Sequence, residues 1–366
     1  MIPINKPLLD KREAAEILKV LKDGVLTSAS MEGGRQVRDF ENLMKEYLGV
    51  REVISVNSGT SALYSSLLSC GIGIGDEVIL PSFTFVATAN SVVATGARPV
   101  FVDINRDDFT INLENLEKKI TDKTKAVIPV HLYGHPANMG GIKDLLRKRS
   151  IYIIEDACQS LGSTYEGKQT GTIGDIGCFS LYASKVLTSG EGGFIATNDK
   201  LISNKIRMIR NHGMVKGYDT RILGMNMRLP EINAAIAKVQ MKKLETMLRS
   251  RKHNANTLSK ILSSIKGVNI PEEQHERMYN WYLYTISFTN NIRNKIGKVL
   301  NQKGIGAAVY YDPPVHKTPY YRNLISNLTL TNTEWASRHV LSLPVHPLLT
   351  EKELEFICST LKEALG

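Results

Sequence analysis

Lys185 and Asp156 are the residues whose types and positions predict the most specific chemistry in this chain. Asp156 ends the apolar run 151–156, a pattern typical of a buried strand that delivers an acid at its C-terminal edge. Lys185 precedes the glycine-rich run 190–193. A lysine amine can hold an aldehyde as a Schiff base, and a carboxylate can keep a pyridine nitrogen protonated. The pair predicts chemistry on pyridoxal 5'-phosphate (PLP), rather than a surface lysine that extends into solvent.

A glycine turn between a strand and a helix predicts a phosphate site. The run 53–56 is typical of a strand, and Asn57-Ser58-Gly59-Thr60-Ser61 follows it and opens a helix. Free N–H groups and the dipole of a helix N-terminus attract phosphate, and the hydroxyls of Thr60 and Ser61 add donors. An ordinary helix cap would have the same sequence. The loop does not have the GxGxxG or GxxxxGK[ST] pattern of dinucleotide and P-loop sites.

Three more residues complete the predicted constellation. Phe85 follows a strand end and could stack on a flat heteroaromatic ring, although a core Phe would follow the same pattern. Gln159, three positions after Asp156, could hydrogen-bond the phenolic oxygen of the cofactor. Ser180 is expected to touch the phosphate if its strand ends beside the loop 58–61. A phosphate loop, a stacking aromatic, an acid and a lysine are together far more specific than any one of them.

The order of these motifs resembles that of a known family. The chain is similar over nearly its whole length to the DegT/StrS family of PLP-dependent nucleotide-sugar aminotransferases, a branch of the aspartate-aminotransferase fold (fold type I). The motifs that carry the resemblance are Phe40-Glu41, Tyr47-Leu48-Gly49, Ser58-Gly59-Thr60-Ser61-Ala62-Leu63, Gly75-Asp76-Glu77-Val78, Pro129-Val130-His131-Leu132-Tyr133-Gly134, Glu155-Asp156-Ala157-Cys158-Gln159, Ser184-Lys185, Gly190-Glu191-Gly192-Gly193, Asn211-His212-Gly213 and Ser342-Leu343-Pro344-Val345-His346-Pro347.

The resemblance implies a role for individual residues. Lys185 matches the lysine that forms the Schiff base, and Asp156 matches the acid on the pyridine nitrogen. Both are therefore expected to be catalytic. The residues expected to bind the cofactor are Gly59, Thr60, Ser61, Phe85, Asp156, Gln159, Ser180, Lys185 and Asn226.

One segment of the resemblance concerns assembly. Residues 224–229 match a segment that in relatives crosses a dimer interface towards the partner's cofactor phosphate, with Met225 in place of the usual Tyr. The match implies a homodimer with shared active sites, in which Asn226 and the nearby guanidinium of Arg228 suit an anionic phosphate. His316 matches a C-terminal segment that lines the sugar site in relatives. Arg228 and His316 are accordingly expected to bind substrate.

Short apolar strands alternate with helical patterns along the first two thirds of the chain. Strands are expected at 53–55, 77–80, 99–103, 126–131, 151–155, 178–182 and 193–197, with helices at 9–23, 37–47, 60 onwards, 84–95 and 139–149 and a hairpin at 164–171. This alternation predicts an α/β fold with a mostly parallel central sheet flanked by helices. A long helix over 231–264, strands at 281–288 and 307–311, and helices at 291–302 and 351–363 predict a smaller C-terminal α+β domain. The expected division is 1–245, a large PLP-binding α/β domain that includes the N-terminal helices, and 246–366.

Composition excludes several other classes of protein. The chain has 366 residues, 42% of them hydrophobic, and no apolar stretch of membrane-spanning length. Residues 1–7 have no apolar signal core, so a cytoplasmic protein is expected. The four cysteines and eight histidines show no zinc-ligand spacing, and no metal site is expected. The net charge of +10 is scattered along the chain, which favours a solvated surface or an anionic substrate over nucleic acid.

The favoured function is transfer of an amino group from an amino acid, with L-glutamate as the expected donor, to a keto group of a nucleotide-linked keto-deoxysugar. Such enzymes serve deoxysugar and polysaccharide biosynthesis. A keto-cyclitol aminotransferase remains an alternative. A PLP-dependent deoxysugar dehydratase is disfavoured, because those relatives carry His where Lys185 stands. A non-catalytic binding protein is the least favoured alternative.

Overall fold

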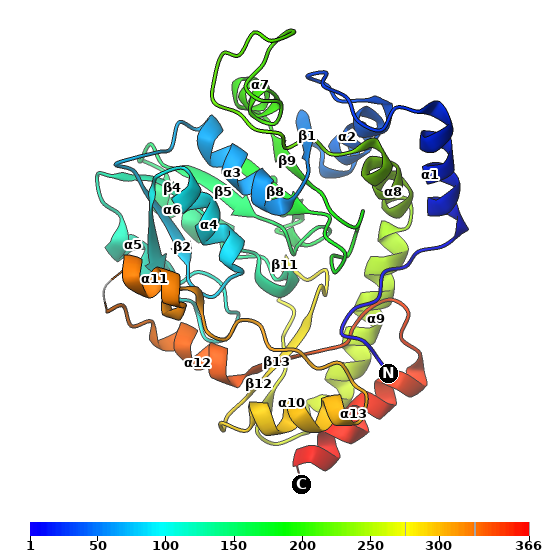
Figure 1. The fold of residues 1–366 in the computed structure, drawn as a ribbon. Coiled ribbons are helices and arrows are strands. Elements are labelled where there is room, and N and C mark those ends of the chain that lie inside the picture. The colour runs from blue at the N-terminus through cyan, green and yellow to red at the C-terminus, as the bar shows by residue number, and fades with distance from the viewer. Residues whose placement is uncertain (275, 326, 366) are drawn as a thin grey trace.

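A seven-stranded mixed sheet forms the centre of the molecule (Figure 1). The computed structural model describes residues 1–274, 276–325 and 327–365. Strands β2, β3, β4, β5 and β8 pair in parallel, whereas β9 runs antiparallel to both of its neighbours, β1 and β8. In spatial order the strands are β1 (Glu52–Val56), β9 (Gly193–Thr197), β8 (Ile176–Ser180), β5 (Tyr152–Asp156), β4 (Thr124–Val127), β2 (Glu77–Pro81) and β3 (Arg98–Val102).

Helices cover both faces of this sheet because its strands are apolar on both sides. Successive residues point to opposite faces, so Ile153 packs into one hydrophobic cluster and Ile154 into another. On the Ile154 face lie α3 (Gly59–Ser69), α4 (Val86–Ala94) and α7 (Lys200–Ile209). On the other face lie α2 (Arg35–Leu48), α5 (Leu113–Lys119), α6 (Met139–Leu146) and α8 (Glu231–Met241), with α1 (Lys11–Asp23) packed against α8.

The C-terminal part of the chain builds a second, antiparallel sheet at the lower side of Figure 1. It consists of β10 (Val268–Asn269), β12 (Tyr284–Phe288) and β13 (Val340–Leu343). A separate apolar core lies between this sheet and the helices α9 (Leu244–Leu262), α10 (Arg293–Gln302) and α13 (Glu351–Leu365). A small third sheet of β6 (Thr164–Tyr165), β7 (Lys168–Gln169) and β11 (Arg277–Met278) joins the two parts of the chain.

The structure confirms the α/β class and the mostly parallel sheet, and it corrects two predicted elements. The expected helix over 231–264 is two helices, because α8 ends at Met241 and α9 starts at Leu244. The buried Lys243 at this break binds Glu13 and Asp10 of the α1 region, a tertiary contact that periodicity does not reveal. The expected strand over 307–311 is also wrong, since Ala308 forms only an isolated bridge with Ser342.

The apolar clusters do not follow one cut through the sequence. Ile2 packs into the core of the C-terminal sheet. In the opposite direction, part of the C-terminal region packs against the central sheet. This region contains η2 (Val315–Lys317), α11 (Pro319–Leu324) and α12 (Thr331–His339), and its buried contacts are made by Val315, Tyr321 and Leu330. The division at residue 245 therefore stays a prediction. The N-terminal residue Ile2 and the C-terminal residues Val315, Tyr321 and Leu330 each pack into the core on the other side of it.

A buried charge network fastens the edge of the sheet at β1. Glu41 of α2 accepts hydrogen bonds from Arg207 (3.0 Å) and Arg210 (2.8 Å), both on or directly after α7, and from the Ser55 N–H (2.8 Å). All three side-chain partners are buried. A buried ion pair is costly to break because it leaves a charge without compensation.

We expect Glu41→Gln to lower the free energy of unfolding by about 3 kcal/mol, since both guanidinium groups lose their shared charge partner. Urea unfolding followed by circular dichroism measures the change. Glu46→Gln, an exposed position of the same helix, is the matched control and should change stability by less than about 0.5 kcal/mol. Equal effects of the two substitutions would contradict the role given to the network.

Candidate active site

The carboxyl end of β5 presents two adjacent acids to opposite faces of the sheet. Glu155 is fully buried and accepts hydrogen bonds from His131 Nε2 (2.8 Å) and from the backbone N–H groups of Gly171, Ile173 and Gly174. His131 Nδ1 accepts from the Ala137 N–H, so Nε2 carries the proton donated to Glu155. Glu155 is thus a structural anchor.

Asp156 is turned the other way and is also buried, with 6% of its surface exposed. Its Oδ2 accepts a hydrogen bond from Thr88 Oγ1 (2.8 Å), and its Oδ1 accepts from the Cys158 N–H (3.2 Å). Thr88 lies on α4, above the end of β5. The orientation of the carboxylate is therefore fixed by two donors. Its oxygens can each accept a further hydrogen bond.

The start of α3 forms a cradle beside Asp156. Ser58 caps the helix by accepting from the Ser61 N–H (3.0 Å), while the Gly59 and Thr60 N–H groups belong to the unbonded first turn. A Cβ added to Gly59 would lie 2.9 Å from Cys158 Sγ and 3.0 Å from Ser180 Cβ. Only glycine therefore lets the loop lie this close to the ends of β5 and β8, and Gly59 lies beside Ser180.

The hydroxyl of Ser61, a predicted phosphate donor, is already hydrogen-bonded within the loop. Its hydroxyl donates to Asn57 Oδ1 (2.6 Å) and lies 3.0 Å from Ser58 Oγ. The side chain is committed to the cap of the helix. Thr60, in contrast, is exposed at the mouth of the cradle.

Lys185 lies in the connection between β8 and β9, partly buried under an aromatic ring. Its Nζ donates a hydrogen bond to Tyr282 Oη (3.5 Å) and lies 4.5 Å from the centroid of the Tyr282 ring. Ser184 Oγ is 3.1 Å from the same hydroxyl. Tyr282 comes from the segment that leads into β12, so the C-terminal part of the chain forms one wall of the site.

Cys158 lies between the Gly59 cradle and Asp156, whose Oδ1 accepts a hydrogen bond from the Cys158 N–H. Burial raises the pKa of the Cys158 thiol well above its ordinary value; the carboxylate of Asp156 acts in the same direction, and the ammonium group of Lys185 opposes it. Cys158 is therefore an inert, protonated thiol that fills the space between the cradle and the acid.

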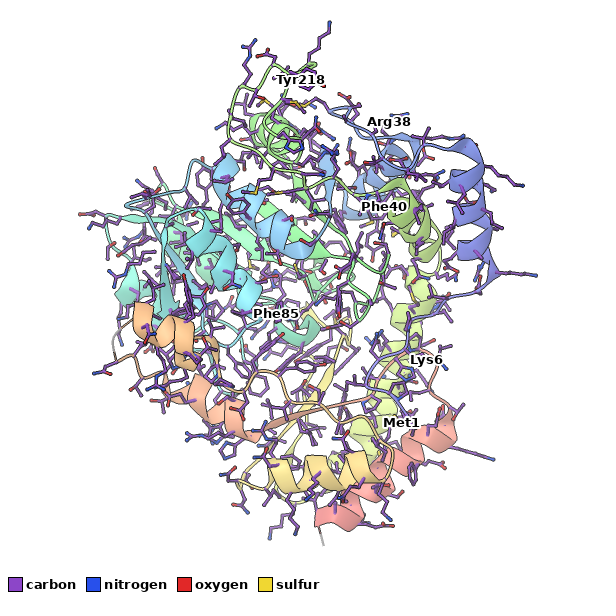
Figure 2. The ribbon with its side chains drawn as sticks, viewed as in Figure 1. Met1, Lys6, Arg38, Phe40, Phe85 and Tyr218 are labelled. Carbon is purple, nitrogen blue, oxygen red and sulfur yellow. The ribbon has the colours of Figure 1, made fainter. Side chains whose placement is uncertain are left out.

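Aromatic side chains form the remaining walls. Phe85 precedes α4, is 56% exposed, and lies towards the middle of the molecule in Figure 2. Its ring centroid is 6.3 Å from that of Tyr311. Gln159 donates to Tyr311 Oη (3.1 Å) and accepts from the Tyr133 N–H (2.8 Å), so both ends of its amide already have partners. Burial raises the pKa of Tyr311 well above its ordinary value, and Asp156 contributes to the shift.

The residues assigned by resemblance alone lie at two other places. Asn226 is exposed, and its carbonyl accepts from Asn57 Nδ2 (3.3 Å), next to the cradle of the same chain. Arg228 donates to Asn211 Oδ1 (2.7 Å), which commits part of its guanidinium. His316 is buried, with Nδ1 2.6 Å from Ser82 Oγ and Nε2 3.3 Å from Glu334 Oε1. A direct contact between a sugar and the His316 ring would require one of these bonds to break.

Three residues of the site are not predicted from the sequence. Thr88, Tyr282 and Tyr311 contact Asp156, Lys185 and Gln159 respectively, from positions far away in the sequence. The aromatic run 281–284 and the Tyr310-Tyr311 pair are visible in the sequence. Their composition alone does not distinguish a site wall from an ordinary core.

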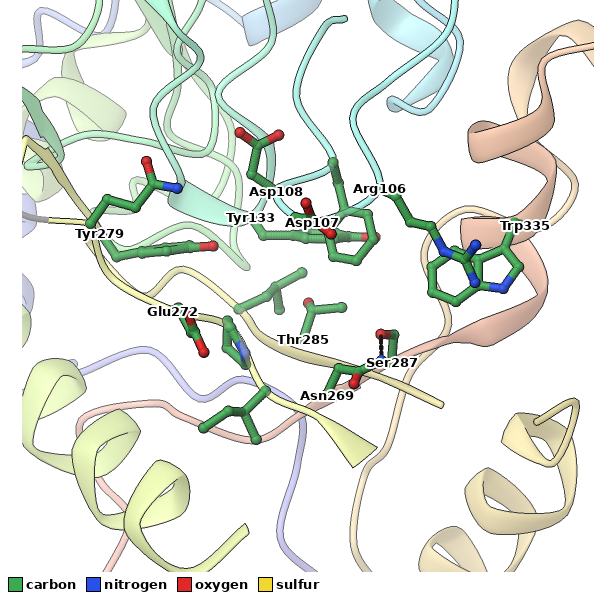
Figure 3. Close-up of a pocket in the computed structure, with 15 residues that line it drawn as sticks. Arg106, Asp107, Asp108, Tyr133, Asn269, Glu272, Tyr279, Thr285, Ser287 and Trp335 are labelled. Atoms are coloured by element: carbon green, nitrogen blue, oxygen red, sulfur yellow. Dashed lines mark hydrogen bonds between the residues drawn. The ribbon is translucent and has the colours of Figure 1, made fainter. Parts of the chain in front are cut away.

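A separate cavity of ≈ 320 Å³ lies between the loop that follows β3, the strand β12 and the helix α12 (Figure 3). Arg106 stacks on Trp335, 3.9 Å from its ring centroid, at one end, and Tyr279 closes the other. A cavity is the usual position of a ligand, yet none of the predicted site residues lines this one. Tyr133 stands between the cavity and Gln159, so the cavity lies behind the wall of the candidate site.

The chemical groups of the site residues match the parts of PLP: its phosphate, its ring nitrogen, its ring face and its aldehyde. Gly59, Thr60 and Ser180 offer N–H and hydroxyl donors to a phosphate. Asp156 offers a fixed carboxylate for a protonated ring nitrogen, and Phe85 an open aromatic face. Lys185 supplies the amine. Among the described residues, no cluster of three or more His, Cys, Asp or Glu side chains could hold a metal ion.

Comparison with known proteins agrees with this arrangement. Residues 7–362 match the DegT/DnrJ/EryC1/StrS aminotransferase family. The chain is 34% identical to GDP-perosamine synthase of Caulobacter vibrioides, over 100% of this chain and 98% of the relative. It is 36% identical to UDP-N-acetyl-3-dehydro-alpha-D-glucosamine 3-aminotransferase of Acidithiobacillus ferrooxidans, over 93% and 92% of the two chains.

A solved structure extends the likeness to the whole fold. Spr1654 of Streptococcus pneumoniae in its PLP-form superimposes with a TM-score of 0.93 at 26% identity, and the match covers 99% of this chain and 98% of the other. The expected fold type, enzyme class and cofactor are thereby confirmed. The chain is a PLP-dependent aminotransferase, and it belongs to the DegT/DnrJ/EryC1/StrS aminotransferase family.

Proposed function

We propose that this enzyme moves an amino group from an amino acid, L-glutamate in the first instance, to a keto group of a nucleotide-linked sugar. The observation that carries the proposal is that Gly59 lies against Cys158, whose N–H binds Asp156, and against Ser180, which begins the loop that carries Lys185. The two curated relatives support the substrate class, because one is named for a GDP-linked and the other for a UDP-linked sugar. The net charge of +10 also suits an anionic substrate.

Each site residue has a distinct task in this reaction. When bound, PLP supplies an electron sink for negative charge next to the reacting nitrogen. Gly59, Thr60 and Ser180 would hold its phosphate. Asp156, oriented by Thr88, would keep the proton on the ring nitrogen. The Lys185 amine would hold the cofactor until an amino donor arrives and then carry a proton from the donor's α-carbon, ending each cycle as it began.

A second chain is proposed to complete the site. The connection between α7 and α8 extends from the body of the molecule at the top of Figure 1, with Tyr218 at its tip in Figure 2. Tyr218 is 99% and Leu223 69% exposed, and Met225 beside Asn226 is also exposed. Large apolar side chains gathered on an exposed loop are typical of an interaction surface. In a homodimer, this loop would carry Asn226 to the partner's phosphate cradle.

The substrate class is tested directly with a panel of nucleotide-linked keto-sugars. With glutamate as donor, at least one GDP-, UDP- or dTDP-linked keto-sugar should give a product whose mass shows the exchange of oxygen for NH₃. Lys185→Ala is the matched control for slow uncatalysed exchange. Turnover of free keto-cyclitols with rejection of all nucleotide sugars would favour the cyclitol alternative.

Asp156→Asn is expected to keep the fold and lower kcat by at least about 100-fold. An amide has nearly the same shape and can still accept from Thr88, but it carries no charge to hold the ring proton. Steady-state kinetics and the absorbance of bound PLP measure the effect. Near wild-type kcat with full PLP occupancy would show that another acid does this work.

Mixing two impaired chains tests the shared site. If Asn226 acts across the interface, a dimer of one Lys185→Ala chain and one Asn226→Ala chain places both lesions in one site and leaves the other intact. Activity should then recover towards one working site per mixed dimer. The homodimer of each variant is the control. No recovery after verified subunit exchange, or full activity of a monomer, would contradict the shared site.

A further inference from the structure

Tyr282 makes two different contacts with the amine of Lys185. Its hydroxyl accepts a hydrogen bond from Nζ at 3.5 Å, and the centroid of its ring lies 4.5 Å from the same atom. The hydroxyl is also 3.1 Å from Ser184 Oγ. A phenol oxygen can accept from an ammonium group and donate to a neutral amine, and an aromatic face attracts the charged form. The contact therefore suits both protonation states of the lysine.

The backbone around Tyr282 is strained and is held by several hydrogen bonds. Trp281 has φ 54°, a left-handed conformation that is unfavourable for a bulky side chain. Asn280 Oδ1 accepts from the Tyr282 N–H (2.8 Å), while Asn280 Nδ2 donates to the carbonyls of Gln159 and Leu161. Two residues that follow Asp156 are thereby bonded to Asn280, two positions before Tyr282. Strain of this kind persists only where the surroundings fix it, and it gathers at functional sites.

Arg251 supplies the second restraint. Its buried Nη1 donates to the carbonyls of Trp281 (3.0 Å) and Tyr282 (3.2 Å), and its Nη2 donates to Asn5 Oδ1 (2.8 Å). Burial lowers its pKa to about 10. Among the described residues, Arg251 has no carboxylate partner. The buried Arg251 cation therefore holds the carbonyls of Trp281 and Tyr282, and it restrains the position of Tyr282.

We propose that Tyr282 is a catalytic residue that holds and orients the free amine of Lys185 while that amine transfers protons, with Arg251 and Asn280 as its positioning residues. The inference rests on the role proposed above for Lys185. During that phase the lysine has no covalent tether and a flexible four-carbon stem. A small displacement of a reacting group lowers a rate steeply. The amine gives back each proton that it takes, so Tyr282 acts without net consumption of protons.

Tyr282→Phe removes the hydroxyl and keeps the ring. Rapid mixing of the PLP-loaded variant with glutamate should show the proton-transfer step slowed by about tenfold. The primary isotope effect with α-deuterated glutamate should rise, because proton transfer becomes more rate-limiting. Bound PLP and the KM for glutamate should stay near their wild-type values. Ser184→Ala should change the rate in the same direction and by less.

A second measurement needs no cofactor. In PLP-free protein, the rate at which cyanate carbamylates Lys185, followed by peptide mass spectrometry, reports how firmly the amine is held. We expect the rate to rise in Tyr282→Phe and to rise further in Tyr282→Leu, which also loses the ring face. An unchanged rate in both variants would overturn the proposal.

Tyr284→Phe is the matched control for the loss of a buried hydroxyl. Tyr284 lies two residues further along, and its hydroxyl is 2.8 Å from Ser259 Oγ, away from Lys185. If Tyr282→Phe behaves like Tyr284→Phe in both measurements while Lys185→Ala is inactive, Tyr282 has only a structural role. If Lys185→Ala retains activity, the role of Lys185 itself is wrong, and the two failures are thus distinguished.

Discussion

The buried carboxylate of Glu155 fixes the point on which the rest of the site depends. It accepts from His131 and from three backbone N–H groups of the loop 171–174, and all of these lie on one side of the β5 end. A carboxylate with this many donors has a single favourable position. Because neighbouring residues of a strand alternate, the position of Glu155 also determines where Asp156 points.

The same end of the sheet gathers parts from three strands. β1 ends in the cradle at Gly59, β8 ends at Ser180, and β5 ends at Asp156. The cradle is narrow because Gly59 has no Cβ, and the inert Cys158 thiol fills the remaining space. Tight packing, rather than any single strong bond, therefore sets the distance between the predicted phosphate donors and the acid.

The sequence predicts the parts of the site that local structure decides. Asp156 at a strand end and Gly59 in a strand-to-helix turn follow from short-range patterns, and both lie where those patterns put them. Partners from distant segments could not be found in this way. Thr88 lies 68 residues before Asp156, and Tyr282 lies 97 residues after Lys185. These contacts depend on how α4 and the C-terminal sheet pack, and no local periodicity encodes that packing.

Two predicted assignments concern side chains that already have polar partners in the structure. Ser61 has a hydroxyl at a helix N-terminus, but this hydroxyl donates to Asn57 Oδ1 and accepts from Ser58 Oγ, and both bonds hold it in the cap. His316 lies in a segment that matches a sugar-lining region, but Ser82 and Glu334 occupy both sides of its ring. In each case neighbouring polar groups determine what the side chain can contact, and those neighbours are visible only in three dimensions.

The antiparallel return of β9 beside β8 has a consequence for how the enzyme matures. Ser180 and Gly193 are paired partners, so the loop that carries Lys185 is closed by two adjacent strands. Closing so short a loop requires little loss of chain entropy, and such local contacts form early in folding. Tyr282 belongs to a segment made about a hundred residues later, and it arrives only when the C-terminal sheet docks. In a newly made chain, the loop that carries Lys185 would thus be closed before Tyr282 reaches the amine. Docking of the C-terminal sheet would then be the step that completes the site.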